Sequence, residues 1–160
     1  MAKSPNGASV AVVMGSSSDQ PVMAECTRYL EYFGISFQGV VLSAHRNPEE
    51  TAQFAREAQA RGVKVIIAGA GMAAHLAGVI AANTTLPVIG VPLAGSELHG
   101  VDALYSMVQM PSGVPVATMA IGKAGAINAA VLAAQILALE DEAIQQKLVA
   151  FKKQGCKLPQ

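Results

Sequence analysis

Short apolar runs alternate with helical patterns along the whole of this 160-residue sequence. Each run is rich in Val, Ile and Ala and carries few charges, which is typical of parallel strands that are buried on both faces. Such runs occur at residues 9–15, 35–42, 63–68, 87–93 and 114–121. Strands that alternate with helices form a parallel sheet covered on both sides. The sequence therefore predicts an α/β fold, a flavodoxin-like three-layer αβα sandwich with a five-stranded parallel sheet and a C-terminal helical extension.

The helices are predicted from apolar spacing and from the residues at their ends. The first lies between Asp19 and Gly34, where a glycine can end a helix. The second has a clear start, because Asn47 can cap it, Pro48 suits its first position and Glu50 stands where a capping box needs an acid. Further helices are expected at residues 73–83, 101–109 and 124–139.

The end of the chain carries a separate amphipathic segment, residues 140–154. Ile144, Leu148 and Phe151 form an apolar stripe on it, which must pack on another surface and could do so on a neighbouring subunit. No linker or repeat interrupts the sequence, so residues 9–154 are predicted to form a single domain. The ends, residues 1–8 and 155–160, are expected to be flexible.

A low content of charged residues sets this sequence apart from ordinary soluble domains. Charged residues make up 14% of the chain and apolar residues 52%, whereas about 25% charged residues is usual. Other copies of the chain are therefore expected to cover much of its surface, in a homo-oligomer. The alternative explanation, a membrane span, needs about 20 uninterrupted apolar residues, and Gly, Pro, Asn or Gln breaks the longest runs.

Charge balance, cysteine content and motif spacing limit the possible ligands and the cellular location. Eleven basic residues balance eleven acidic ones, and no basic cluster occurs, so we expect a small ligand and no nucleic acid. The N-terminus lacks the apolar core of a signal peptide and the chain has two cysteines, which favours the cytoplasm. No H-x-x-x-H or C-x-x-C spacing occurs, so no metal site is predicted.

Polar or glycine-rich loops follow the first three predicted strands. They read GSSSD at residues 15–19, SAHR at 43–46 and GAGMAAH at 69–75. In a doubly wound sheet, ligands bind outside the carboxyl ends of the strands, at the point where the strand order reverses. We therefore expect these three loops to meet in one ligand site.

An anion fits the first two of these loops. Ser16 and Ser18 offer hydroxyl and backbone N–H groups at a helix start, which suits phosphate oxygens. Arg46 offers a planar guanidinium that matches phosphate or carboxylate geometry. Asp19 would repel a phosphate, so it either accepts hydrogen bonds from sugar hydroxyls or caps the first helix.

Two histidines stand in the predicted site loops. An imidazole can both give and take a proton near neutral pH, which suits His45 to general acid–base catalysis. Ser43 and Arg46 beside it favour that role over a plain surface position. His75 either bonds a ligand group or is a buried structural histidine, and no function is assigned to His99 or to the rest of residues 94–99.

Five segments together resemble a known family: GSSSD at 15–19, SAHRNP at 43–48, GAGMAAHLAG at 69–78, GVDALYSMVQMPSGVPVATMAIG at 100–122 and AGAINAAVLAAQIL at 124–137. The chain resembles the class I N5-carboxyaminoimidazole ribonucleotide mutases, the PurE family of bacterial purine biosynthesis, over roughly residues 9–150. The resemblance implies a flavodoxin-like subunit, a homo-octamer and no cofactor. It also implies an isomerase that moves a carboxylate from the exocyclic nitrogen to ring carbon C4 of an aminoimidazole ribonucleotide.

The resemblance implies roles for the residues of the first two loops. His45 would be the general acid and base, which protonates the departing nitrogen and later removes the C4 proton. Ser16 and Arg46, helped by Ser43, would bind the 5′-phosphate of the ribonucleotide. Asp19 would bind the ribose hydroxyls.

The third loop would surround the reacting end of the substrate. The resemblance implies that Ser18, Gly71 and His75 line the base and its migrating carboxylate. Because CO₂ is released transiently, the pocket must be closed and dry, and small residues let the backbone approach closely. Met72 departs from the family, in which glycine is common there, and we expect this change to affect loop motion and not the reaction.

Two other functions compete with the mutase. The nearer one is the animal-type carboxylase, which joins free CO₂ to aminoimidazole ribonucleotide on a related fold, although SAHR followed by GAGMAAH favours the mutase. The other is a flavin-binding electron carrier, because a serine-rich loop after the first strand can also hold a flavin phosphate. Flavin rings are usually flanked by aromatic side chains, and the three site loops contain no Trp, Tyr or Phe.

Overall fold

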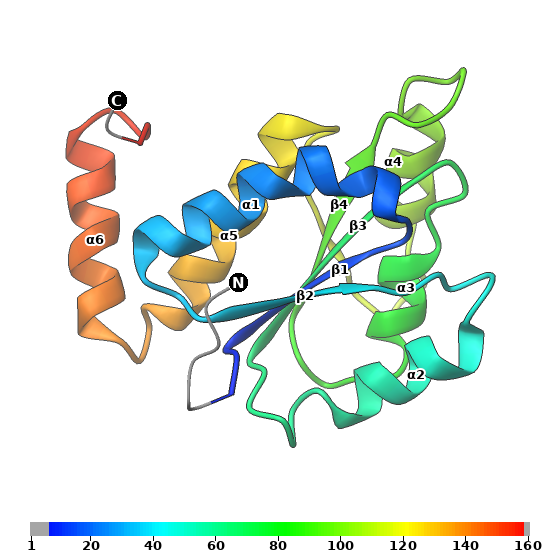
Figure 1. The fold of residues 1–160 in the computed structure, drawn as a ribbon, viewed down its shortest axis with the longest axis horizontal. Helices are drawn as coiled ribbons and strands as arrows, with labels where there is room; N and C mark the ends of the chain where they lie inside the picture. Colours follow the sequence, from blue (N-terminus) through cyan, green and yellow to red (C-terminus); the bar gives the residue numbers. More distant parts are fainter. Residues whose placement is uncertain (1–6, 159–160) are drawn as a thin grey trace.

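All strands of the sheet run parallel, as the apolar runs predict. The computed structural model describes residues 7–158, and within them five strands pair in the order β2-β1-β3-β4-β5 (Figure 1). Their bounds are Val10–Met14 for β1, Phe37–Val41 for β2, Val65–Gly71 for β3, Val88–Leu93 for β4 and Ala117–Thr118 for β5. The order reverses between β1 and β3, which is the flavodoxin-like arrangement. The predicted fold class is confirmed.

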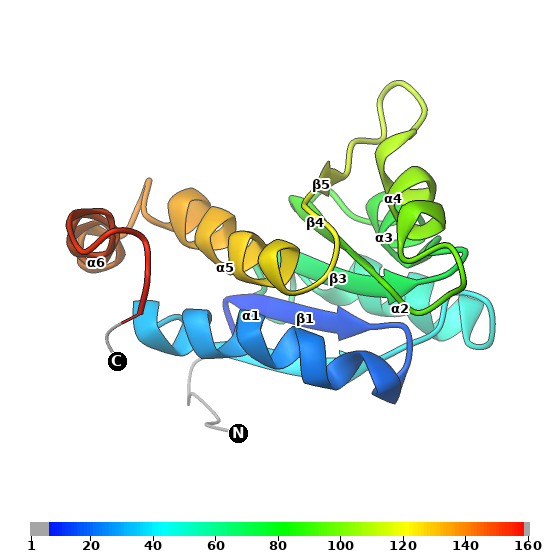
Figure 2. The same cartoon turned by 90° about the horizontal axis from the view of Figure 1, so that it is seen from above.

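Helices cover the sheet on both faces and extend it at one end. Figure 2 shows α1 and α5 side by side on one face, while α2, α3 and α4 lie on the other. The C-terminal helix α6 follows beyond α5. The bounds are Gln20–Phe33 for α1, Pro48–Glu57 for α2, Leu76–Ala81 for α3, Val101–Val108 for α4, Lys123–Leu137 for α5 and Glu142–Lys153 for α6. A short 3-10 helix, η1 (Ser17–Asp19), precedes α1.

Two apolar cores result, one on each face of the sheet. Successive side chains of a strand point to opposite faces, so Val10 and Val12 belong to the core under α1 and α5, and Ala11 and Val13 to the core under α2 to α4. All four are fully buried. Burial on both faces explains why the strands read as continuous apolar runs, and each fully buried valine contributes about 1.5–3 kcal/mol.

Helix α6 packs on its own chain. Its apolar stripe is buried, and the Phe151 ring lies 5.4 Å from the ring of Phe33 on α1. Asp141 caps the helix, because its carboxylate accepts hydrogen bonds from two backbone N–H groups of the first turn. A neighbouring subunit is therefore not needed to bury the stripe. Residues 1–6 and 159–160 of the predicted flexible ends lie outside the described residues, and Leu158 packs against the core.

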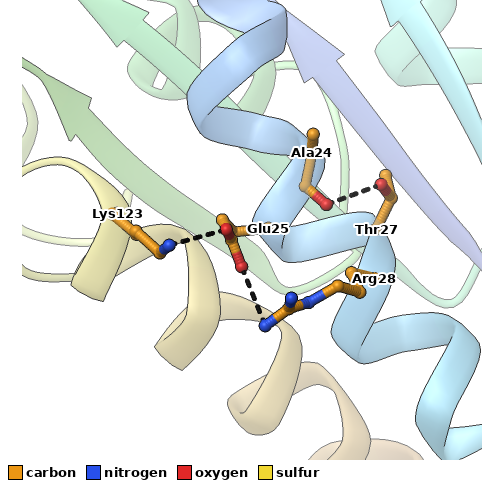
Figure 3. Close-up of polar contacts among 5 residues, drawn as sticks. All are labelled: Ala24, Glu25, Thr27, Arg28 and Lys123. Atoms are coloured by element: carbon orange, nitrogen blue, oxygen red, sulfur yellow. Dashed lines mark hydrogen bonds and ion pairs between the residues drawn. The ribbon is translucent and has the colours of Figure 1, made fainter. Parts of the chain in front are cut away.

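An ion cluster ties α1 to the start of α5. Figure 3 shows Glu25 of α1 between Lys123, at 2.7 Å, and Arg28, at 3.3 Å. The hydrogen bond from Lys123 lowers the pKa of the Glu25 carboxyl, with a further contribution from the charge of Arg28. In the same turn of α1, the Thr27 hydroxyl donates to the carbonyl oxygen of Ala24. No helix within residues 7–158 is both long enough and apolar enough to span a membrane.

Two predicted strand limits are wrong. The fifth run was expected to pair over residues 114–121, but only Ala117–Thr118 forms a strand, against β4. Pro115 has no N–H for a ladder, and beyond β5 only isolated bonds such as Met119 N–H to the Gly90 carbonyl continue the contact. Conversely, β3 continues through Gly71, so most of the predicted loop 69–72 is strand.

The side-chain cap predicted for α2 is not formed. Asn47 precedes Pro48 at the helix start, as expected, but its side chain forms no capping hydrogen bond. Instead the hydroxyl and the backbone N–H of Thr51 both bond to the Asn47 carbonyl, at 2.8 and 3.0 Å. The helix predicted at residues 73–83 is likewise shorter, because α3 covers only Leu76–Ala81.

Candidate functional site

A pocket of about 540 Å³ lies at the carboxyl ends of the strands. The loops after β1, β2 and β3 line it, since these strands are neighbours in the sheet and their following loops gather on the right of Figure 1. The pocket includes every site residue predicted from the sequence: Ser16, Ser18, Asp19, Ser43, His45, Arg46, Gly71 and His75. Their proximity is thus a property of the fold, whereas their individual roles stay predictions.

The loop after β1 is held by its own side chains. The Ser16 hydroxyl oxygen accepts bonds from the Ser18 backbone N–H, at 3.3 Å, and the Ser18 hydroxyl, at 2.9 Å. The Ser16 backbone N–H in turn donates to Oδ2 of Asp19, at 2.9 Å, which completes a capping box around η1. Because the Ser16 oxygen acts as acceptor in both bonds, its own O–H remains able to donate to a ligand.

Asp19 combines a local role with a place in the pocket. It stands at the N-cap position of α1 without a side-chain bond to that helix, so its capping role belongs to η1. Burial raises the pKa of the Asp19 carboxyl, and the bond from the Ser16 N–H opposes that rise. Within residues 7–158 no hydrogen bond to Oδ1 is formed, which leaves an acceptor for a sugar hydroxyl.

The loop after β2 is a tight turn that presents Arg46. The Ser43 hydroxyl accepts a bond from the Arg46 backbone N–H, at 3.2 Å, and the Ser43 carbonyl accepts one from the Asn47 N–H, at 2.7 Å. The Arg46 side chain is exposed and forms no ion pair with any described residue. A bidentate cation is therefore available at the rim of the pocket.

The two pocket histidines contact each other directly. Nε2 of His45 lies 2.9 Å from Nδ1 of His75, and the rings meet edge to face with centroids 5.0 Å apart. One of these two nitrogens must donate and the other must accept, so the two imidazoles cannot both be cationic while the bond is intact. The pair can therefore hold and pass one proton. Among the described residues, no group of three or more His, Cys, Asp or Glu side chains is placed to hold a metal ion.

The loop after β4 was not predicted to reach the site, yet Gly95 lines the pocket. A Cβ atom added to Gly71 would lie 3.1 Å from the Leu93 carbonyl oxygen and 3.5 Å from the Gly95 nitrogen. The small residue at position 71 thus allows β3 and the β4 loop to meet closely. Sheet order was the available signal, because β4 adjoins β3 and the two following loops must lie on the same edge.

Comparisons with known proteins identify the family. The AIR carboxylase family model matches residues 9–157. The N5-carboxyaminoimidazole ribonucleotide mutase of Haemophilus influenzae is 56% identical over 91% of this chain and 89% of its own length, and that of Escherichia coli 53% over 92% and 88%. The crystal structure of Treponema denticola PurE superposes with a TM-score of 0.83 at 30% identity, covering 92% of this chain and 90% of that one. The resemblance seen in the motifs is therefore confirmed, and the chain belongs to the AIR carboxylase family.

Proposed function

We propose that this chain is an N5-carboxyaminoimidazole ribonucleotide mutase, an isomerase of purine biosynthesis that forms 4-carboxy-5-aminoimidazole ribonucleotide. Relatives that bear this name are more than half identical to it over nine-tenths of its length. The observation that carries the proposal is the meeting of a serine loop, an arginine and a bonded histidine pair in one pocket. These groups match the phosphate and the proton transfers of such a substrate.

The phosphate and ribose are bound by the loops after β1 and β2. Ser16 donates its O–H, and Arg46 its guanidinium, to the 5′-phosphate. Ser43 holds the turn that presents Arg46 and can add its own O–H. Asp19 accepts hydrogen bonds from the ribose hydroxyls, which its ionised form does best.

His45 carries out both proton transfers. Protonated His45 gives its proton to the exocyclic nitrogen as the nitrogen–carboxyl bond breaks, which leaves CO₂ and the neutral amine. Carbon C4 then attacks the CO₂, and His45 takes the C4 proton back, so no net proton is consumed. Ser18 and Gly71 border this space, and His75 keeps the imidazole of His45 oriented through their hydrogen bond.

The working enzyme is a cytoplasmic homo-octamer in this proposal. Its support is the low charge of the chain and the large apolar side chains left exposed on α4, namely Val101, Tyr105 and Val108. Their spacing puts them on one helical stripe, which a partner chain would cover. Light scattering at micromolar concentration tests the assembly.

The function is tested with His45→Asn and the matched control His99→Asn. His99 is exposed, is not among the described residues that line the pocket, and has a φ of +51° that asparagine tolerates well. We expect His45→Asn to lose turnover by at least about 10²-fold with ligand affinity largely kept, and the control to match wild type. Near-normal turnover of His45→Asn would refute the catalytic role.

The carboxylase alternative is separated by the requirement for bicarbonate. A mutase converts the N-carboxylated ribonucleotide without added bicarbonate, because the carboxyl group comes from the substrate itself. A carboxylase needs bicarbonate or CO₂ and starts from aminoimidazole ribonucleotide. A strict bicarbonate requirement would therefore overturn the proposed activity while leaving the family membership intact.

A further inference from the structure

Met72 occupies an unusual position in the pocket. It directly follows the last residue of β3 and lines the pocket wall. Its φ of +56° lies in the left-handed region, which residues with a Cβ atom rarely adopt. Its side chain is 61% exposed, so packing of that side chain in a core does not compensate the strained backbone. Strained residues of this kind concentrate at ligand-binding sites, where their geometry is part of the function.

The left-handed residue Met72 begins the short segment that carries His75. Two residues after Met72 the chain makes a second tight turn, in which the His75 N–H bonds to the Ala73 carbonyl at 2.8 Å. The His75 ring then meets His45. Met72 thus lies at the pocket, on the segment that also supplies the partner of the proposed catalytic base.

The chemistry of the pocket wall singles out Met72. Most of the other wall side chains are polar or are no larger than a methyl group, and Leu76 is 98% buried. Among the described wall residues, Met72 is therefore the large apolar side chain that is free to move. A thioether with three rotatable bonds adapts its shape to a flat ring and contacts aromatic surfaces favourably.

We propose that Met72 is a substrate-contacting residue whose side chain folds over the bound heterocycle and excludes water from the migrating carboxyl group. Because Met72 lines the pocket, this role replaces the expectation from the sequence that Met72 affects loop motion and not the reaction. It rests on the proposed function, because it concerns the interval in which CO₂ has left the nitrogen and has not yet joined C4. If CO₂ escapes in that interval, the products are aminoimidazole ribonucleotide and free CO₂. An apolar cover lowers that loss without taking part in proton transfer.

The test measures how substrate divides between product and loss. Wild type and the variants Met72→Leu, Met72→Ala and Met72→Gly are given the N-carboxylated ribonucleotide in ¹³C-bicarbonate buffer. Released aminoimidazole ribonucleotide and the ¹³C content of the product are then measured, after subtraction of the rate without enzyme. We expect Met72→Ala and Met72→Gly to raise both quantities about three- to tenfold, and Met72→Leu, which keeps an apolar side chain of similar size, to stay within about twofold.

The variants Met72→Ala and Met72→Gly distinguish the effect of the missing side chain from the effect of the backbone conformation. Alanine keeps the cost of positive φ, whereas glycine removes it, so both variants leak alike only if the missing side chain is the cause. Normal partition in Met72→Ala, or a defect confined to Met72→Ala and absent from Met72→Gly, would overturn the role of Met72. Failure of the proposed function looks different, because wild type itself would then not convert the substrate.

Discussion

Removal of the Phe151 side chain tests how α6 is attached to the rest of the chain. Phe151 is 2% exposed, and its ring meets three aromatic rings of α1. The centroid distances are 6.0 Å to Tyr29, 6.0 Å to Tyr32 and 5.4 Å to Phe33. Truncation to alanine therefore leaves a cavity between α6 and α1.

The expected loss is large on the scale of a domain's stability. Replacing a buried phenylalanine with alanine costs about 3–5 kcal/mol in the free energy of unfolding. For a chain of this length, that corresponds to a fall in Tm of about 6–20 °C. Phe151→Leu keeps much of the apolar volume and should cost about 1–2 kcal/mol. Val149→Ala is the control on the same helix, since Val149 is 45% exposed and should change stability by less than about 0.5 kcal/mol.

Urea unfolding followed by circular dichroism measures these differences. It is done at two protein concentrations tenfold apart, because an oligomer's stability depends on concentration. If α6 packs on its own chain, the difference between wild type and Phe151→Ala is the same at both concentrations. A loss below about 1 kcal/mol would refute the packing argument. A difference that grows on dilution would show that the stripe on α6 is buried by another subunit.

Three more changes test other parts of the structure. Arg46→Ala should raise KM by about tenfold or more with kcat less affected, and an unchanged KM in steady-state kinetics would contradict phosphate recognition. Glu25→Gln should lower stability most above pH 4.5, the ordinary pKa of the group, because Lys123 lowers the pKa of the Glu25 carboxyl in the folded chain. The difference should shrink as the pH falls from 4.5 through that lowered pKa, and a pH series of urea unfolding checks this sign. Gly125→Ala should destabilise the fold by about 1–3 kcal/mol or more, despite the helix propensity of alanine, because the new Cβ would lie 1.7 Å from the Ala120 carbonyl oxygen. Thermal unfolding measures this loss, and an unchanged Tm would show that residue 120 can move aside.

Burial could be predicted from the sequence better than pairing could. The runs that became β1 and β4 were located to within two residues, because continuous apolar sequence bounded by glycine or proline requires a strand covered on both faces. The run at residues 114–121 is equally apolar, yet it pairs only at Ala117–Thr118. Apolar sequence reports which residues are hidden from water, whereas pairing also needs backbone donors in register, and Pro115 lacks one.

The site could be predicted as a place but not as a network of contacts. Topology alone puts the loops after β1, β2 and β3 on one edge, so Ser16, His45 and Gly71 were expected to share a pocket. The bond between His45 and His75 depends on side-chain rotamers, which no sequence pattern specifies. The left-handed backbone at Met72 was not predicted either, because methionine rarely adopts positive φ. The signal for it was the glycine that is common at this position in the family, since glycine adopts positive φ readily.

Stability and chemistry are divided between the two ends of the strands. No predicted site residue except Gly71 comes from within a strand, and Gly71 is the last residue of β3. The interior of β1 is filled with valine and alanine that are fully buried, while the polar site residues Ser16, Ser43 and His75 lie two to four residues beyond the ends of β1, β2 and β3. The sheet therefore fixes the positions of the loops without contributing side chains to the reaction. Substitutions within the strands should act on folding, and substitutions in the loops should act on binding or turnover. A loop variant that changes both stability and activity is therefore evidence that the backbone at that position, as at Met72, is part of the site.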